Sequence, residues 1–215
     1  MVKRMFKTIL FDLDGTLVDS SEGILNAAKE ALSRLGMDPP PDDEIKSCIG
    51  PPLGETLESI MGWSETQKME FYDIFRPVYK DKYVFQCELY PGIEQLLKEL
   101  KEKGMLVGIA TNKRKDSSES LLQYLEIDYL FDTVIAQDQQ IIRNKSDMIL
   151  DALKSLQLRK EDVVMIGDSI GDLNAARDAG VRFIGVHYGF GFKEEVEDDM
   201  EIADSVDDLK RILLE

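Results

Sequence analysis

Thr8-Ile9-Leu10-Phe11-Asp12-Leu13-Asp14-Gly15-Thr16 is a short apolar run that ends in two carboxylates, two residues apart, and a glycine. A continuous run of β-branched and aromatic residues is typical of a strand buried on both faces of a parallel sheet. Asp12 and Asp14 then lie just past the carboxyl end of that strand, which is where open α/β sheets bind their ligands. Two acids this close repel each other unless a cation lies between them, so the string indicates a cation site.

Four later apolar runs have the same character and are each followed by polar or glycine residues: Leu106–Ala110, Thr133–Ala136, Val163–Ile166 and Arg182–Val186. Segments with helical periodicity separate the later runs. Helices are predicted over about 92–103, from 146 onward, over 172–179 and, with Ser205 as N-cap, at the end of the chain. This alternation predicts the fold class, which is α/β with a doubly wound parallel-sheet (Rossmann-like) core.

Residues 18–88 have a different composition, without a convincing strand pattern. Helical periodicity predicts a helix that ends at Gly36, and further helices are expected over about 42–48, 54–61 and 65–83. Pro77 interrupts the last of these and is expected to kink or break it. We therefore predict two domains: an α/β core of residues 1–17 and 89–215, and an all-helical insert of residues 18–88.

The chain has 215 residues, with 42 acidic and 26 basic side chains and a formal net charge of −16. Such a charge repels a phosphate backbone and an anionic membrane surface, so we expect neither a nucleic acid nor a membrane as partner. No apolar run approaches the roughly 20 residues that a membrane-spanning helix needs, and no export signal is evident. Because Cys48 and Cys87 do not form a disulfide-scaffold pattern, we predict reduced thiols and a cytoplasmic location.

A second acidic string, Gly167-Asp168-Ser169-Ile170-Gly171-Asp172, follows the fourth apolar run and opens a helix. Three or four carboxylates converging at one sheet edge favour Mg²⁺, which takes few protein ligands and keeps positions for water and phosphate oxygens. Thr111 and Asn112 follow the second run, and Lys145 opens a helix. A hydroxyl and a cation at the same edge can hold an anion, so the whole set is typical of phosphoryl transfer.

The ordered strings FDLDGT (11–16), ATN (110–112), the lone Lys145 and GDSIGD (167–172) resemble the four motifs of the haloacid dehalogenase-like hydrolase superfamily. The resemblance spans nearly the whole chain. A helical insert after the first motif is similar to the small cap of the branch that includes phosphoglycolate phosphatases, so the insert is expected to be such a cap. Two less specific strings also resemble that branch: IGPPLGETL (49–57) and GVHYGFG (185–191).

Carried over to this sequence, the resemblance implies that Asp12 is the nucleophile, which forms an aspartyl-phosphate. Asp14 would protonate the leaving group and then activate water, which requires a carboxyl pKa above the usual value of about 3.9. Thr111 would donate a hydrogen bond to the phosphoryl oxygens. Asn112 would orient the substrate, and Lys145 would offset the negative charge of the nucleophile and the phosphate.

The resemblance also implies Mg²⁺ as the cofactor. Asp168 would bind the ion together with Asp12 and the backbone carbonyl of Asp14. Asp172 would lie behind these ligands and hold either Mg²⁺-bound water or Lys145. The ion and the lysine would together reverse the local charge, which an anionic substrate requires in so acidic a protein.

One position departs from the pattern of the family, which usually has proline after its lysine, whereas Ser146 follows Lys145 here. We expect Ser146 to cap the helix instead, and Arg143 is a competing cation. Within the insert, Lys46 and the Pro51-Pro52 loop are candidate substrate contacts, and the loop is otherwise explained as the end of a helix.

These features predict a Mg²⁺-dependent phosphatase of small-molecule phosphate monoesters that acts through an aspartyl-phosphate, with a phosphoglycolate-like substrate favoured. The sole histidine, His187, is expected at a strand end without a role, so carboxylates carry the catalysis. The alternatives are a hexose-phosphate mutase of the same superfamily and a non-catalytic phospho-aspartate receiver switch. A cysteine phosphatase is excluded because no arginine lies six residues after either cysteine, and the sequence contains no P-loop string.

Overall fold

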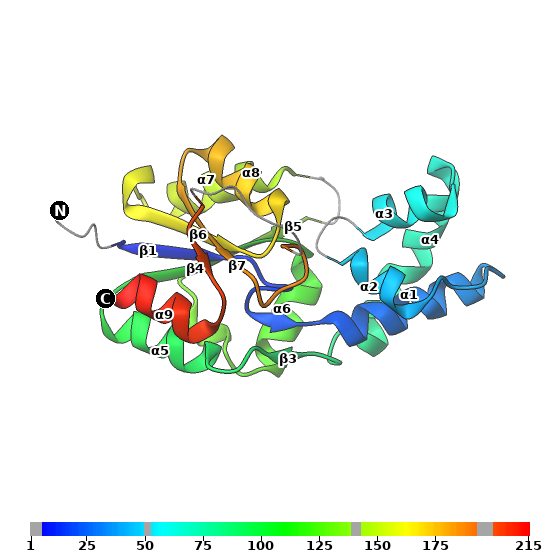
Figure 1. The fold of residues 1–215 in the computed structure, drawn as a ribbon, viewed down its shortest axis with the longest axis horizontal. Helices are drawn as coiled ribbons and strands as arrows, with labels where there is room; N and C mark the ends of the chain where they lie inside the picture. Colours follow the sequence, from blue (N-terminus) through cyan, green and yellow to red (C-terminus); the bar gives the residue numbers. More distant parts are fainter. Residues whose placement is uncertain (1–5, 50–52, 139–142, 193–199) are drawn as a thin grey trace.

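The computed structural model describes residues 6–49, 53–138, 143–192 and 200–215. Within these residues the core is a six-stranded sheet in the order β5-β4-β1-β6-β7-β8, and every pairing in it is parallel (Figure 1). The strands are β1 (Thr8–Phe11), β4 (Leu106–Arg114), β5 (Thr133–Gln137), β6 (Val163–Gly167), β7 (Arg182–Val186) and β8 (Ile202–Ala203). All five predicted strands are present, and β4 extends four residues beyond its predicted end at Ala110.

The register of the three central strands determines where the polar side chains lie. β1 lies between β4 and β6, and Phe11 is opposite both Ile109 and Ile166. Because the strands are parallel, the residues that follow this row emerge at the same edge of the sheet. Asp12 comes directly after the row on β1, and Asp168 comes just after the end of β6.

Helices cover both faces of the sheet (Figure 1). One buried apolar cluster joins the sheet to α5 (Ile93–Glu102), α6 (Lys115–Tyr124) and α9 (Val206–Leu214). A second cluster joins it to α7 (Lys145–Ser155) and α8 (Ile170–Ala179). The side chains of β1 divide between the two, since Ile9 and Phe11 belong to the first cluster and Leu10 to the second, as the two-residue period of a strand requires. The predicted doubly wound α/β fold class is confirmed.

Local signals in the sequence explain most of the helix ends. Ser169 and Asp172 form a capping box at the start of α8, and Gly180 ends this helix in the left-handed conformation with φ +74°. The side chain of Ser205 accepts a hydrogen bond from the backbone N–H of Asp208 and caps α9, as predicted. Besides two short strands at the ends of the insert, four elements have no counterpart among those predicted: α6, β8, and the 3₁₀ turns η2 (Asp128–Leu130) and η3 (Lys160–Asp162).

The inserted segment is helical through most of its length and has its own apolar cluster, which includes Leu25, Ile45 and Phe71. Its helices are α1 (Ser21–Arg34), α2 (Asp42–Ser47), α3 (Leu53–Met61), α4 (Glu65–Val78) and the π-helix η1 (Tyr79–Tyr83). The predicted irregularity at Pro77 is present: proline cannot donate the backbone hydrogen bond of an α-helix, and α4 gives way to η1 two residues later.

The chain passes between the core and the insert through two short strands, β2 (Val18–Asp19) and β3 (Glu88–Leu89), which pair antiparallel. The prediction that residues 18–88 contain no strand is therefore wrong at both ends. Strands of two residues are too short to produce an alternating pattern in the sequence. The division of the chain at residues 18 and 88 stays a prediction, and the separate apolar cluster of the insert supports it. We call the insert the cap from here on.

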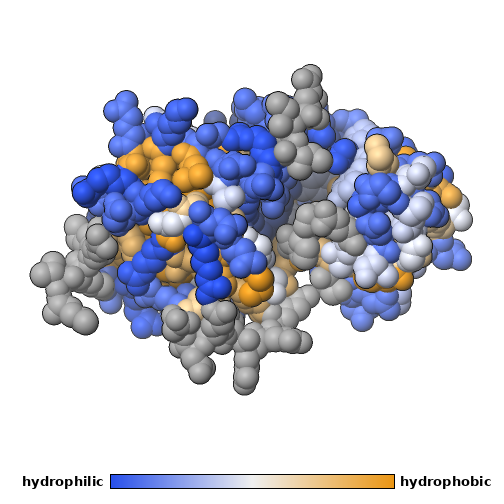
Figure 2. Space-filling model, turned by 90° about the horizontal axis from the view of Figure 1, so that it is seen from above, coloured by the Kyte–Doolittle hydropathy of each residue, from blue (hydrophilic) through white to orange (hydrophobic). Residues whose placement is uncertain are grey.

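On the face shown in Figure 2, hydrophilic residues predominate and apolar residues form only small patches. None of the helices in the described part of the chain combines the length and the apolar character needed to cross a membrane. Cys48 and Cys87 both lie in that part and form no disulfide bond. The cytoplasmic location stays a prediction.

The amphipathic packing of α5 on the sheet leads to a prediction about stability. Leu97 is fully buried under the sheet, whereas Leu150 on α7 is 37% exposed. We expect Leu97→Ala to lower the free energy of unfolding by about 2–5 kcal/mol because it leaves a cavity. The matched change Leu150→Ala should alter it by about 0.5 kcal/mol or less. Urea titration followed by circular dichroism measures both values, and equal losses would contradict the packing described.

Candidate active site

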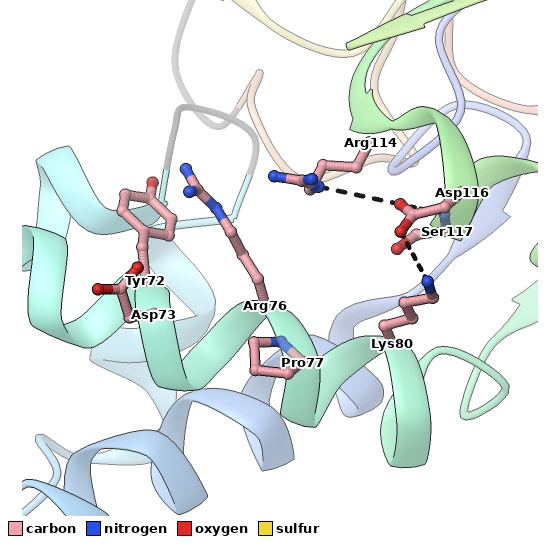
Figure 3. Close-up of a pocket in the computed structure, with 8 residues that line it drawn as sticks. All are labelled: Tyr72, Asp73, Arg76, Pro77, Lys80, Arg114, Asp116 and Ser117. Atoms are coloured by element: carbon pink, nitrogen blue, oxygen red, sulfur yellow. Dashed lines mark hydrogen bonds and ion pairs between the residues drawn. The ribbon is translucent and has the colours of Figure 1, made fainter. Parts of the chain in front are cut away.

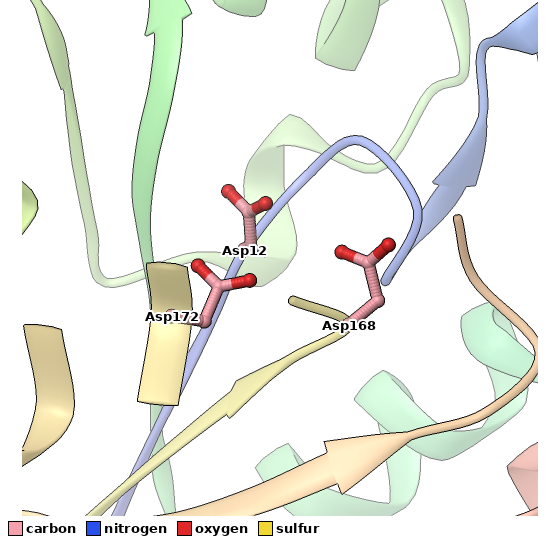
Figure 4. Close-up of side chains that lie close together, drawn as sticks. All are labelled: Asp12, Asp168 and Asp172. Carbon is pink, nitrogen blue, oxygen red and sulfur yellow. The ribbon is translucent and has the colours of Figure 1, made fainter. Parts of the chain in front are cut away.

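Three buried carboxylates meet at the edge of the sheet predicted to bind the ligand. Asp12, Asp168 and Asp172 each place a carboxylate oxygen within 4.8 Å of the other two (Figure 4). Asp12 follows β1, Asp168 follows β6, and Asp172 comes from the first turn of α8. The predicted convergence of the two acidic strings is therefore present in the structure, from residues about 160 positions apart in the chain.

Two segments hold Asp168 in place. Its Oδ2 accepts hydrogen bonds from the backbone N–H groups of Phe190 at 2.7 Å and Gly191 at 3.2 Å, and Thr16 donates to Oδ1 at 3.4 Å. A Cβ on Gly15 would lie 2.3 Å from Asp168 Oδ2, and Gly15 also has a φ of +81°. Only glycine fits there without strain, which explains the residue after the second acid of the first motif.

Asp172 serves both the helix and the site. Its Oδ2 accepts hydrogen bonds from the backbone N–H of Ser169 at 3.1 Å and from the Ser169 hydroxyl at 2.7 Å. Its Oδ1 accepts a hydrogen bond from Lys145. The capping box therefore fixes the carboxylate that in turn orients the lysine.

Lys145 lies buried between two acids, at 2.8 Å from Asp12 Oδ1 and in contact with Asp172. Burial lowers the pKa of a lysine, but the two carboxylates outweigh burial and raise the pKa of Lys145 above its ordinary value. The competing cation, Arg143, forms its ion pair with Asp151 instead. The structure thus brings the predicted lysine, and not the arginine, to the nucleophile candidate.

The predicted helix cap at Ser146 is wrong. The helix α7 begins at Lys145 itself, with Asn144 in the N-cap position and no side-chain hydrogen bond at that cap. Ser146 is therefore already the second residue of the helix. Asp12 and Asp172, and not a helix cap at Ser146, orient the side chain of Lys145.

The pKa values of two of the three acids are strongly raised in this buried group. Burial raises the pKa of Asp168 to about 7, and the nearby charges of Asp12 and Asp172 add to the rise. Burial also raises the pKa of Asp12 to about 6, against the opposing effect of Lys145. Three carboxylates against one ammonium leave the group with an excess of negative charge whenever all three acids are ionised, so the site favours an additional cation.

The donor set fits Mg²⁺. All three candidate ligands are carboxylates, which are the oxygen donors that this hard cation prefers. Asp12 Oδ1 is buried and makes no aligned hydrogen bond within the described residues, although the ammonium group of Lys145 lies at ion-pair distance. An oxygen atom in that position is available to a metal ion.

Asp14 lies apart from this group and has different partners. Lys113 donates from Nζ to both carboxylate oxygens of Asp14, at 2.9 and 3.0 Å, and Ser20 donates to Oδ1 at 2.6 Å. The carboxylate of Asp14 is thus not part of the metal-ligand candidate group. The expected ligand from this residue, its backbone carbonyl, stays a prediction.

Lys113 also connects the acid to the cap, because its Nζ donates to the hydroxyl of Tyr79 at 2.6 Å. Burial raises the pKa of Tyr79 to about 12, so its hydroxyl stays neutral and can accept this bond. Asp14 and Tyr79 outweigh burial and raise the pKa of Lys113. The sequence analysis missed Lys113, Tyr79 and Ser20. For Lys113 a signal existed, since it lies two residues after Thr111 on the same strand.

The residues predicted to bind the substrate, Thr111, Asn112 and Lys46, do not belong to the group of three carboxylates. Thr111 is buried at the end of β4, and its Oγ1 accepts a hydrogen bond from the backbone N–H of Lys113 at 3.2 Å. Asn112 is exposed and accepts a hydrogen bond from Gln137 at 3.3 Å. Lys46 is exposed on α2, and a substrate contact there stays a prediction.

Two further positions complete the comparison with the sequence. His187 pairs with Asp204 through Nδ1 at 2.8 Å and lies outside the carboxylate group. The Pro51-Pro52 loop lies outside the described residues.

The model of the family described as haloacid dehalogenase-like hydrolase matches residues 9–186. The chain belongs to the haloacid dehalogenase-like hydrolase family. The predicted superfamily is confirmed.

Relatives of several activities resemble the chain. A 5'-nucleotidase from Pseudomonas aeruginosa is 33% identical and aligns over 89% of this chain and 87% of its own length. A phosphoglycolate phosphatase from Aquifex aeolicus is 30% identical over 82% of each chain. The tyrosine-protein kinase PtkA of Mycobacterium tuberculosis is 32% identical over 85% of this chain, which spans 62% of that kinase.

A crystal structure of a predicted phosphatase from Clostridium acetobutylicum superposes with a TM-score of 0.90 at 32% identity, covering 98% of this chain and 99% of the other. The predicted enzyme class, a phosphoric monoester hydrolase of the phosphoglycolate phosphatase-like branch, is confirmed by the family and by the relatives named as phosphatases. The non-catalytic receiver alternative is therefore wrong.

The raised pKa of Asp168 leads to a prediction about metal and stability. In the unfolded chain this acid ionises near 3.8, but in the folded protein only near 7, so ionisation opposes folding and stability falls as pH rises between these values. At a pH well above 7 and in EDTA, we expect Asp168→Asn to raise the melting temperature, by about 2–4 °C for each kcal/mol recovered. Saturating Mg²⁺ should raise the melting temperature of the wild type and leave that of the variant unchanged.

Asp178→Asn is the matched control, because Asp178 is exposed on the same helix that carries Asp172. This variant should respond to Mg²⁺ as the wild type does. Differential scanning calorimetry with and without Mg²⁺ measures all three proteins. An equal Mg²⁺ response in Asp168→Asn and the wild type would show that the ion binds elsewhere.

Proposed function

We propose that the protein is a Mg²⁺-dependent phosphatase that hydrolyses small-molecule phosphate monoesters through an aspartyl-phosphate on Asp12. The observation that carries this proposal is the position of Asp12, which is buried beside Lys145 within a group of three carboxylates. Such a group suits a divalent cation and, once that cation is bound, a phosphoryl group. The family supports the reaction class.

In the first step, a carboxylate oxygen of Asp12 attacks phosphorus and the bond from phosphorus to the ester oxygen breaks. Lys145 lies 2.8 Å from Asp12 and favours the ionised form of that carboxylate, which offsets part of the effect of burial on its pKa. The same ammonium group offsets the charge of the incoming phosphate. Mg²⁺, when bound among Asp12, Asp168 and Asp172, would offset the remaining carboxylate charge and polarise the phosphoryl group.

Asp14 is proposed to transfer a proton in each of the two steps. It donates a proton to the departing ester oxygen, and it then accepts a proton from the water that attacks the phosphorus of the aspartyl-phosphate, which releases inorganic phosphate and restores Asp12. Lys113 and Ser20 hold the Asp14 carboxylate in a fixed position between these events. Thr111, buried at the end of β4, is proposed to donate to the phosphoryl group, and Asn112 to orient the substrate.

A phosphoglycolate-like substrate is favoured by the relative from Aquifex aeolicus, which is named a phosphoglycolate phosphatase. The cap supports a small substrate, since Tyr79 of the cap contacts Lys113 beside the proposed acid. Closure of a cap over the site excludes water and limits the size of the leaving group.

Replacement of the nucleophile tests the proposal. We expect Asp12→Asn to lower kcat for p-nitrophenyl phosphate by about 10³-fold or more, because an amide cannot form the aspartyl-phosphate. Asp178→Asn, an exposed matched change, should keep the wild-type rate. EDTA should abolish the wild-type activity, and added Mg²⁺ should restore it. Full activity in Asp12→Asn would refute the mechanism.

Replacement of the acid separates the two steps. Nitrophenolate is a good leaving group that needs little protonation, so Asp14→Asn should still be phosphorylated by p-nitrophenyl phosphate. Hydrolysis of the aspartyl-phosphate needs a base, and its loss should slow this step by about 10²–10⁴-fold. Stopped-flow absorbance should then show a burst of about one nitrophenolate per enzyme followed by slow turnover. The absence of a burst, with both steps slowed alike, would contradict the assignment of Asp14.

A further inference from the structure

A polar cavity of about 340 Å³ lies between the cap and the core, and none of the residues that line it belongs to the carboxylate group. Its cap side is formed by α4 and η1, and its core side by the end of β4 and the start of α6 (Figure 3). The cavity is lined by three cations, Arg76, Lys80 and Arg114, and by two acids, Asp73 and Asp116. In a chain with a net charge of −16, an excess of positive charge in a cavity is unusual.

The lining charges do not all neutralise one another. Lys80 forms an ion pair with Asp116 at 2.9 Å, whereas Arg114 lies 3.9 Å from the same carboxylate. Asp116 also accepts a hydrogen bond from the backbone N–H of Ser117 at 2.8 Å, and Lys80 and this bond overcome burial to lower the pKa of Asp116. One carboxylate is therefore shared between two cations, and its stronger contact is with Lys80.

Arg76 forms no ion pair with any residue of the described chain and is held by packing instead. Its guanidinium carbon lies 4.4 Å from the ring centroid of Tyr72. The hydroxyl of Tyr72 accepts a hydrogen bond from the backbone N–H of Gly54 at 2.8 Å, and a Cβ on Gly54 would lie 2.4 Å from the ring. A side chain at position 54 would thus displace Tyr72, and glycine there fixes the surface on which Arg76 rests.

The two arginines face each other across the cavity. In Figure 3 the guanidinium groups of Arg76, from the cap, and Arg114, from the core, point toward the same space, and Asp73 lies on the far side of Arg76 from Arg114. Two like charges held in this arrangement repel each other, and an anion between them removes the repulsion. Guanidinium groups bind carboxylates and phosphates with paired hydrogen bonds, so they suit such an anion.

The two arginines of the cavity lie close in the chain to residues that hold the proposed acid. Arg114 follows Lys113, whose Nζ contacts the Asp14 carboxylate, and Arg76 lies one helical turn before Tyr79, whose hydroxyl contacts the same Nζ. Each side of the cavity is thus near in the chain to one of the residues that contact each other beside the proposed acid, Lys113 on the core side and Tyr79 on the cap side. A group bound between the arginines would belong to the leaving-group half of a substrate, since Asp14 protonates that half.

We propose that Arg76 and Arg114 bind a second anionic group of the substrate, a carboxylate or a phosphate, remote from the phosphate that is hydrolysed. This inference rests on the proposed phosphatase function and narrows its substrate class to phosphate monoesters with two anionic groups. A nucleoside monophosphate has only the scissile phosphate and would leave both arginines unpaired. Arg76 and Arg114 act on specificity and take no part in bond breaking.

The test compares kcat/KM for matched substrates in the wild type, Arg76→Gln and Arg114→Gln. Phosphoglycolate against ethyl phosphate tests a carboxylate, and fructose 1,6-bisphosphate against fructose 6-phosphate tests a phosphate. Adenosine monophosphate and p-nitrophenyl phosphate have no second anion. Arg34→Gln is the matched control, since Arg34 is an exposed cap arginine that pairs with Glu30 away from the cavity. Melting temperatures verify that each variant is folded.

We expect the wild type to prefer the doubly anionic member of at least one pair by about tenfold or more, and each arginine variant to lose that preference. The pair that shows the preference identifies the anion. Arg34→Gln should keep the wild-type ratio. A wild type without preference in either pair, or equal losses on all substrates in folded arginine variants, would overturn the inference. If the wild type does not hydrolyse p-nitrophenyl phosphate or any of these esters, the proposed function itself fails.

Discussion

Mutual repulsion among Asp12, Asp168 and Asp172 is the constraint on which the rest of the structure depends. Three carboxylates with oxygens within 4.8 Å of one another are buried, where water screens their charges poorly. One buried ammonium group, that of Lys145, offsets part of this charge. The pKa of Asp12 and that of Asp168 are both raised, first by burial and further by the neighbouring carboxylates. The fold must hold these acids together at a cost that a bound cation or the protonation of an acid relieves.

Local structure supplies the restraint that this repulsion requires. Backbone N–H groups of Phe190 and Gly191 bind Asp168, and the capping box of α8 binds Asp172. Both devices use hydrogen bonds that stabilise the ionised form of a carboxylate. The parallel register of β1 with its neighbours brings the strand ends to the same edge without any contribution from the side chains of the site. The backbone hydrogen bonds, the capping box and the register of the sheet therefore hold the three carboxylates together against their mutual repulsion.

The parts of this arrangement that the sequence could predict are those encoded by short local patterns. The apolar run before Asp12, the glycine after Asp14 and the pairing of the two acidic strings gave the fold class, the central strands and the carboxylate group. Lys145 was a candidate because it is a cation that opens a helix, and its role beside the nucleophile was expected from the resemblance to a family motif. The helix cap expected at Ser146 was wrong because Asn144 occupies the N-cap position. The two-residue strands β2 and β3 have no periodicity to detect.

The contacts that cross between cap and core were not predictable in the same way. Tyr79 and Lys113 lie far from Asp14 in the chain, and although Lys113 follows Thr111 by two residues, nothing in the local sequence indicates that Tyr79 and Lys113 meet beside Asp14. The same is true of Arg76 and Arg114, which belong to different domains of the predicted division. Such contacts depend on how the domains are placed relative to each other, which a local pattern does not encode.

The π-helix η1 connects the contact between Tyr79 and Lys113 to the position of the cap. The widened turn begins at Tyr79 itself, directly where the hydrogen-bonding pattern of α4 changes, and Tyr79 stacks on Phe75 within the preceding helix. A displacement of the cap that withdraws Tyr79 leaves the Nζ of Lys113 with the Asp14 carboxylate as its remaining acceptor in the described chain. The strength of the contact between Lys113 and the Asp14 carboxylate therefore depends on the position of a helix in the cap.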